Sequence, residues 1–325
     1  MKRRLFLKSG SAAAVLPALA ACGGGGGGGA ELGGDAAAWV PAGTPSAAAS
    51  FAALPEKILA CYYTTWDTGT YKLTQVPADF NVLFLFHAKP NGQPIYGNYD
   101  NVGDGSFYFE HYDTVKAEHI QACRDRGQKV LLTVGGARAG FAFTSRAQSR
   151  RFVTSFQTMV ERLGGLDGVD FNNYEADILN DRNLSAVTTE MVWIASQLKS
   201  LYGPGFAVTS PPQPNDPRQQ RLMVAMNGAG VLDCASSQYY DWWGFNQPGY
   251  IKSRTDTWVH LLGDAGKVVV GLSANYGNGP SMDDCVREWE DIRKAHPHIR
   301  GMFAWSAQTN LKAGNSWGLR MRSML

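Results

Sequence analysis

The chain has 325 residues, of which 44% are hydrophobic and 18% are charged. Its 30 basic and 28 acidic residues give a formal net charge of +2, and removal of residues 1–21 would leave 26 basic residues against 28 acidic ones. A balance so close to neutral gives no electrostatic reason to expect a nucleic acid partner.

The N-terminus has the pattern of an export signal. Lys2, Arg3 and Arg4 form a charged start of twin-arginine type, and a small apolar run over 11–21 follows that is too short to span a bilayer. We therefore predict a signal peptide over residues 1–21. The run ends in Leu-Ala-Ala-Cys, which resembles the lipobox of bacterial lipoproteins, so Cys22 is the expected lipid anchor. This predicts an exported protein held at the periplasmic side or the surface of the bacterial cell envelope, with lipid as its only membrane contact.

Residues 22–54 are rich in Gly and Ala and have too little apolar bulk to form a core, so they are predicted to be a tether. The folded body is expected over 55–325. Its four cysteines lack the paired spacing of a zinc site. An oxidising compartment would permit disulfides, and buried thiols packed as small hydrophobic groups are an equally open alternative for Cys61, Cys123, Cys234 and Cys285.

From about residue 55 the sequence alternates strand-like and helical patterns. Apolar strand-like runs are found at 58–63, 80–86, 129–134, 166–174, 206–212, 232–240, 267–272 and 299–306. Helical patterns are found at 112–126, 146–163, 184–201, 257–262 and 282–295. A loop rich in Gly, Asn and Asp is predicted from His87 to Ser106, after the second strand, where barrel enzymes often place substrate contacts.

Eight strands separated mostly by helices predict an α/β fold, a TIM (β/α)8 barrel in a single domain. A doubly wound sheet is the alternative, but it would need a phosphate-binding fingerprint. Gly135-Gly136 follows the third strand without the Lys-Ser/Thr of a phosphate-binding loop, so the fingerprint is not found there.

The fourth strand carries polar side chains at every second position. Asp170 and Asn172 would share one face of this strand, while Val169 and Phe171 take the other. Parallel strands are normally covered on both faces, so an inward carboxylate is costly and suggests a functional site.

The same stretch resembles the signature of family 18 glycoside hydrolases, the chitinases and related proteins. That signature, Asp-Gly-x-Asp-x-Asp-x-Glu, lies on the fourth strand of a TIM barrel, and Asp167, Gly168 and Asp170 match it. The chain then departs from it. Asn172 stands at the next Asp, Tyr174 stands at the catalytic Glu, and the nearest Glu follows one residue late, at Glu175.

Three further motifs resemble the family in the expected order. Thr133-Val134-Gly135-Gly136 is similar to Ser-x-Gly-Gly on the third strand. The segment from Gln238 to Asp241 is similar to Gln-aromatic-Tyr-Asn/Asp, in which the hydroxyl of the Tyr, here Tyr240, contacts the acetamido group of the substrate. Trp305-Ser306 ends the last strand, where the family's Trp forms the floor of the sugar site. The interval from Asp241 to Lys267 is too short for the α+β insertion domain of some members, so none is expected.

Two frames, meaning two patterns of side-chain alternation along the fourth strand, remain open for the position of the catalytic acid. In a regular strand Asp170, Asn172 and Tyr174 share the inner face and Glu175 points away. If a β-bulge absorbs one residue near Asn172-Asn173, Glu175 turns inward and Asn173 lies beside it. Asp177 is a further candidate acid.

The resemblance implies two classes of function. As a chitinase-like hydrolase, the protein would cleave β-1,4 bonds next to N-acetylglucosamine by substrate-assisted, retaining catalysis, with catalytic residues Glu175, Asp170, Asn173 and Tyr240. The alternative is an impaired protein that binds chitin or related glycans, with Trp66, Trp242 and Trp243 as further stacking faces. Substrate contacts are expected from Asn172, Tyr174, Gln238, Asp241 and Trp305. The mechanism implies no cofactor, no metal-ligand set stands out, and a monomer is expected.

Overall fold

The computed structural model describes residues 52–67, 69, 71–92, 103–137, 139–174, 178–241, 244–277 and 279–325. The predicted signal peptide, Cys22 and most of the predicted tether lie outside these residues, as do Glu175 and Asp177. Among the described residues, no helix is long and apolar enough to cross a membrane.

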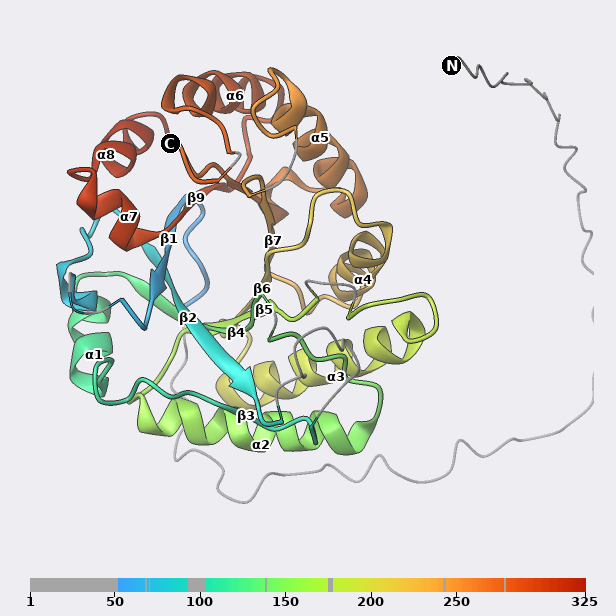
Figure 1. Cartoon of the computed structure of the whole chain (residues 1–325). Helices are drawn as coiled ribbons and strands as arrows, with labels where there is room; N and C mark the ends of the chain where they lie inside the picture. Colours follow the sequence, from blue (N-terminus) through green and yellow to red (C-terminus); the bar gives the residue numbers. More distant parts are fainter. Residues whose placement is uncertain are drawn as a thin grey trace, which may run out of the picture. The chain divides into compact units, whose positions relative to one another are not determined.

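Eight parallel strands among the described residues close into a barrel (Figure 1). Neighbouring strands pair in the order β1-β9-β8-β7-β6-β5-β4-β2, and β1 pairs with β2 to close the ring. A short strand, β3, Phe107–Tyr108, adds to β2 in antiparallel orientation. This confirms the predicted TIM barrel. The barrel strands are β1 Ile58–Thr64, β2 Val82–Pro90, β4 Lys129–Gly135, β5 Gly168–Asn172, β6 Ala207–Ser210, β7 Cys234–Gln238, β8 Val268–Gly271 and β9 Gly301–Trp305.

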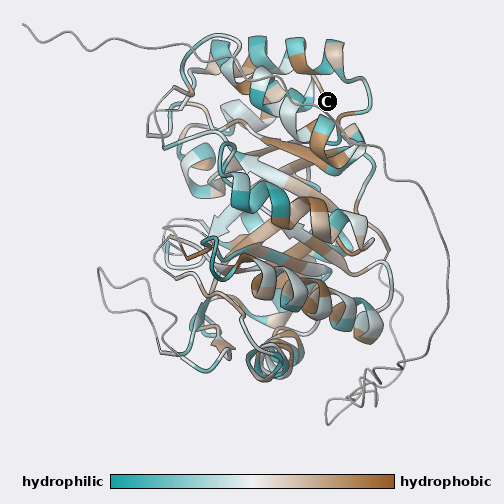
Figure 2. Cartoon of the chain, turned by 90° about the vertical axis from the view of Figure 1, so that its right-hand side faces the viewer, coloured by the Kyte–Doolittle hydropathy of each residue, from teal (hydrophilic) through white to brown (hydrophobic). Residues whose placement is uncertain are grey.

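Helices cover the outer face of the barrel, and Figure 2 shows apolar strands inside helices that carry hydrophilic residues. The helix α2 illustrates why the sequence folds this way. Ser145 caps its first turn by accepting a hydrogen bond from the Gln148 amide, and Phe152 packs against Phe171 of β5 with the ring centroids 5.7 Å apart. The α-helices are α1 Ala117–Asp125, α2 Arg146–Arg162, α3 Leu184–Tyr202, α4 Pro217–Gly228, α5 Tyr250–Leu262, α6 Met282–Ala295, α7 Ala307–Lys312 and α8 Ser316–Arg322.

The inside of the barrel is filled by side chains from alternate strand positions, as a small closed barrel requires. Tyr62 of β1 contacts Phe84 and Phe303, with ring centroids 4.7 and 5.4 Å apart. The other buried members of this cluster are Leu54, Ile58, Ala60, Val82, Phe86, Leu131, Ala207, Cys234 and Val269. The predicted central strand therefore borders an aromatic and aliphatic core.

Several elements differ from the sequence prediction. The strand β2 continues to Pro90, where a loop from His87 was expected, because its end pairs with β3. The helix α5 begins at Tyr250 instead of residue 257, since its first turns are too polar to show a clear apolar stripe. The helix α4 was not predicted, although Asp216-Pro217 is a helix-start signal and the Asp216 side chain does cap it.

The four cysteines of the body are buried and free. This confirms the alternative of packed thiols for the folded chain. Burial raises the pKa of the Cys234 and Cys285 thiols to about 12, so both are protonated and unreactive at neutral pH.

Gly168 is required by the packing between β5 and β6. A Cβ at this position would lie 2.4 Å from the Ala207 carbonyl oxygen and 2.7 Å from the Ala207 Cβ. Because these strands are paired, neither backbone is free to move. Gly168→Ala is expected to lower the free energy of unfolding by about 3 kcal/mol, measured by urea denaturation. Gly228→Ala is the control, because a Cβ there meets no atom within 4 Å. Equal stability of the two variants would contradict this packing argument.

Candidate active site

The carboxyl ends of the barrel strands bring polar side chains together around Asp170. This residue is 0% exposed, and its carboxylate accepts hydrogen bonds from the hydroxyls of Tyr62 at 2.9 Å, Thr133 at 3.0 Å and Thr209 at 2.7 Å. The two threonines are its direct partners in the register of β4 and β6. The barrel thus holds one carboxyl in a cradle of three hydroxyl groups.

The environment of Asp170 tunes its ionisation. Burial raises the pKa of Asp170 to about 6, while the hydrogen bonds from Thr209, Tyr62 and Thr133 act in the opposite direction. A carboxyl with this pKa is able to take up or release a proton near neutral pH. Such groups in a barrel mouth are typical of catalytic sites.

The other matching acid of the motif, Asp167, lies at the opposite end of the barrel. Its carboxylate accepts the Val130 amide at 2.9 Å and forms ion pairs with Lys129 at 3.3 Å and Arg124 at 3.4 Å. These contacts join β4 to α1 below the barrel. Asp167 therefore stabilises the contact between β4 and α1, whereas Asp170 faces the mouth of the barrel.

Asn172 and Asn173 follow Asp170 at the end of β5, and both are buried, with exposed fractions of 6% and 0%. Neither polar atom of the Asn173 amide has a hydrogen-bond partner among the described residues. Its Oδ1 occupies the space that a Cβ of Gly135 would need, at 2.5 Å. A buried amide without a partner costs about 1–3 kcal/mol, so its persistence suggests a role in binding.

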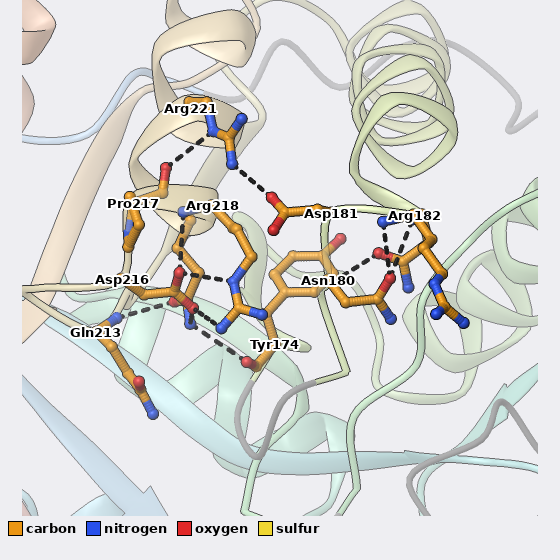
Figure 3. Close-up of polar contacts among 11 residues, drawn as sticks. Tyr174, Asn180, Asp181, Arg182, Gln213, Asp216, Pro217, Arg218 and Arg221 are labelled. Carbon is orange, nitrogen blue, oxygen red and sulfur yellow. Dashed lines mark hydrogen bonds and ion pairs between the residues drawn. The ribbon is translucent and has the colours of Figure 1, made fainter.

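The strand β5 pairs with β4 in regular register through Asn172, where it ends. Asp170 faces the barrel interior, and Phe171 packs outward against Phe152. Alternation would turn Tyr174 inward again. The Tyr174 carbonyl accepts a hydrogen bond from Gln219 of α4 at 3.2 Å (Figure 3).

Burial raises the pKa of the Tyr174 hydroxyl well above its usual value, while the neighbouring Asn173 side chain acts in the opposite direction. The bulge of the second frame would fall at this strand end, near Asn172-Asn173. Glu175 itself lies outside the described residues.

The chain on either side of residues 175–177 is tied to α4 (Figure 3). Gln219 donates to the Tyr174 carbonyl on one side, and Arg221 pairs with Asp181 at 2.8 Å on the other. Asp216 accepts a hydrogen bond from Gln219 at 3.2 Å and so orients this side chain. The helix α4 thus contacts the described chain on both sides of the segment in which the catalytic acid is predicted.

An aromatic wall lies at the same end of the barrel. Trp305 ends β9 and contacts Tyr62, Phe86 and Tyr240, with centroid distances of 5.4, 4.7 and 6.4 Å. The Trp305 and Tyr240 rings are nearly parallel, at 24°, and both are partly exposed. Ser273 fixes the Trp305 backbone by accepting its amide at 2.5 Å. The structure brings these two predicted residues together.

Gln238 and Asp241 have different surroundings. The Gln238 side chain donates to the Pro211 carbonyl at 2.8 Å, so it braces the segment after β6. Asp241 is exposed at the rim, with φ of 59°, and its Oδ1 would lie 2.7 Å from a Cβ on Gly277. Asp241 is therefore open to solvent, unlike Asp170.

Sequence reasoning missed several residues of the site. Tyr62 and Thr209 hold Asp170, Tyr276 lies 6.3 Å from Trp305 between ring centroids, and His87 stacks on Phe86. A hydroxyl at an inward position near the end of each neighbouring strand was the available signal for the first two. Among the described residues, no group of three His, Cys, Asp or Glu side chains is placed to hold a metal ion.

No protein-family model matches the chain. Chitinase ChiA of Flavobacterium johnsoniae is 25% identical over 227 residues, which is 60% of this chain and 14% of ChiA. A family GH18 chitinase from Chromobacterium violaceum has a similar structure, with a TM-score of 0.70 and 17% identity over 89% of this chain and 90% of that one.

Human YKL-39, described as a pseudo-chitinase with retained chitooligosaccharide binding, also has a similar structure. Its TM-score is 0.59, with 13% identity over 82% of this chain and 98% of that one. The fold is thus shared by proteins that cleave chitin and by one that binds its fragments. The chain spans only a small part of the length of ChiA.

Proposed function

We propose that the barrel is a chitinase-like glycoside hydrolase that cleaves β-1,4 bonds next to N-acetylglucosamine. The observation that carries this proposal is the buried Asp170, which three hydroxyls hold and which Tyr62 joins to the wall of Trp305 and Tyr240. Similarity to chitinases in sequence and in fold supports the same reaction class.

In the proposed mechanism, the substrate supplies its own nucleophile. Glu175 donates a proton to the glycosidic oxygen while the acetamido carbonyl oxygen attacks the anomeric carbon, and the bond to the leaving sugar breaks. Water then opens the resulting oxazolinium ring with retention, and Glu175 recovers its proton from that water. The enzyme itself forms no covalent bond to the sugar.

The remaining residues orient the acetamido group and the ring. Asn173 offers an amide donor or acceptor to the acetamide or to Glu175, and Tyr240 offers its hydroxyl to the acetamide. Asp170, with a pKa of about 6, changes between its neutral and its charged form as the reaction proceeds. Trp305 provides an apolar face for the sugar. Asn172 is the alternative to Asn173, and Tyr174 supports the site from the side of α4.

A glycan-binding protein without turnover is the second candidate. An amide stands where the family signature has its last Asp, and an amide cannot take up a charge or a proton. A structural neighbour described as a pseudo-chitinase supports this possibility. In either case we propose that the barrel is exported and tethered to the cell envelope through Cys22, with chitin or related glycans as its partners.

Product formation separates the two functions. The body starting near Ala52 is incubated with tetra-N-acetylchitotetraose, products are followed by mass spectrometry, and binding is followed by calorimetry at low temperature. Shorter N-acetylated products support the hydrolase. Binding without products supports the second candidate, and absence of both would overturn the proposal of a glycan site.

Trp305→Ala is expected to weaken tetra-N-acetylchitotetraose binding roughly tenfold, because a lost aromatic contact of about 1.4 kcal/mol corresponds to a factor of ten. The dissociation constant is measured by calorimetry. Leu319→Ala is the control, since Leu319 is 59% exposed on α8. Equal affinities of the two variants would remove Trp305 from the sugar site.

A further inference from the structure

The strand β2 contains an irregularity at His87. In its pairing with β4, Phe86 lies opposite Thr133 and Ala88 lies opposite Val134, so His87 is an extra residue. Consecutive strand residues normally face opposite sides. Here the rings of Phe86 and His87 stack at 4.2 Å with 12° between their planes, so both point the same way. Bulges of this kind re-aim side chains next to active sites.

Gly136 makes room for this stack. A Cβ on Gly136 would lie 2.5 Å from Phe86 Cζ and 2.9 Å from His87 Nδ1. The backbone conformation agrees, since φ of Gly136 is 117°, which disfavours other residues. Gly136 therefore has a definite function in packing: it accommodates the imidazole that the irregularity of β2 turns to the same side as Phe86.

The hydrogen bond to β4 fixes which nitrogen of His87 carries the proton. His87 Nδ1 contacts the Gly135 carbonyl oxygen, and a carbonyl only accepts, so Nδ1 is the donor. Burial lowers the pKa of His87 to about 4, so the ring is neutral near pH 7. Its Nε2 is then an acceptor, and it makes no hydrogen bond to the described residues. The residue retains 8% exposure.

Trp66 lies beside the stack and is 53% exposed. Its ring centroid is 5.7 Å from that of Phe86 and 6.0 Å from that of His87, at interplanar angles of 72° and 71°. Near-equal distances mean that Trp66 lies along the side of the stack and not at its end. Phe86 also contacts Trp305, so the aromatic wall continues from Trp305 through Phe86 and His87 to Trp66.

We propose that His87 is a sugar-binding residue, whose Nε2 accepts a hydrogen bond from a hydroxyl of a pyranose ring that rests on Trp66. A pyranose presents an apolar face and a rim of hydroxyl donors, and this wall offers an aromatic face with one acceptor at its edge. The inference rests on the proposed glycan site, and it adds a contact on the β1–β2 side of the mouth.

Two substitutions of His87 distinguish a direct contact with the sugar from a purely structural role. In His87→Asn the amide nitrogen takes the place of Nδ1 and keeps the bond to Gly135, but the acceptor is lost. In His87→Gln an amide oxygen reaches the position of Nε2. Both are made in a Glu175→Gln background, so that tetra-N-acetylchitotetraose is not consumed, and its dissociation constant is measured by calorimetry beside the melting temperature.

The expected result is a loss of affinity of about fivefold for His87→Asn, the size of one hydrogen bond of about 1 kcal/mol, and a change below about twofold for His87→Gln. Unchanged affinity in His87→Asn would overturn the inference. Equal losses in both variants, or a loss that follows the melting temperature, would also overturn it, because His87 would then only support β4. Failure of the parent to bind the sugar would instead contradict the proposed function itself.

Discussion

Glu175→Gln is expected to lower the rate of chito-oligosaccharide cleavage by about 10³-fold while leaving binding within about threefold. General acid catalysis by a positioned side chain contributes roughly 10²- to 10⁴-fold, and the amide of Gln cannot donate this proton. The amide is close to the carboxyl in shape, so the sugar contacts remain. The measurement is kcat with a fluorogenic N-acetylated chito-oligosaccharide, together with calorimetric affinity for the unlabelled sugar.

Asp177→Asn is the matched control for this prediction. Asp177 lies two residues further along the same segment, and its removal is expected to change kcat by less than about twofold. If Asp177→Asn abolished cleavage while Glu175→Gln retained it, the acid would be Asp177 and the one-residue bulge would be the wrong frame.

The second large effect is expected at Asp170. Asp170→Asn should lower kcat by roughly 10²-fold, because an amide cannot change its charge beside the acetamido group as the reaction proceeds. Asn still accepts hydrogen bonds from Thr209 or Tyr62, so the barrel should remain folded. The measurement is kcat near pH 7 with the same fluorogenic substrate, and circular dichroism checks the fold. Wild-type turnover in this variant would contradict a catalytic role for Asp170.

The same variant should also change how stability depends on pH. The pKa of Asp170 is about 6 in the folded chain and 3.8 for an ordinary Asp, so the folded state binds more protons between these values. The contribution of Asp170 to the free energy of unfolding therefore falls as pH rises from about 4 to 6, by about 3 kcal/mol in total. Urea denaturation of the parent and of Asp170→Asn at pH 4 and pH 6.5 tests this difference. A constant difference would mean that Asp170 has an ordinary pKa.

The sequence predicted the barrel well because each strand carries its own local signal. Runs such as Val268-Val269-Val270 are apolar and β-branched, and all three residues are buried in β8. The position of Asp170 also followed from alternation. Its partners were harder to predict, since Tyr62, Thr133 and Thr209 come from three strands that meet only when the barrel closes.

The irregular backbone positions could not be predicted from local pattern. The Tyr174 carbonyl accepts a hydrogen bond from Gln219 of α4, and that contact joins residues 45 positions apart. His87 was assigned to a loop, because alternation cannot anticipate a strand with one extra residue. At His87 the one extra residue of β2 decides which side chain faces the mouth.

The most direct test of the proposed chemistry compares two oligosaccharides that differ only in the acetyl group. The parent body is incubated with tetra-N-acetylchitotetraose and with its fully de-N-acetylated counterpart, and products are followed by mass spectrometry. Because the acetamido carbonyl is the proposed nucleophile, cleavage is expected only for the acetylated sugar. Comparable cleavage of the de-N-acetylated sugar would contradict substrate-assisted hydrolysis at this site.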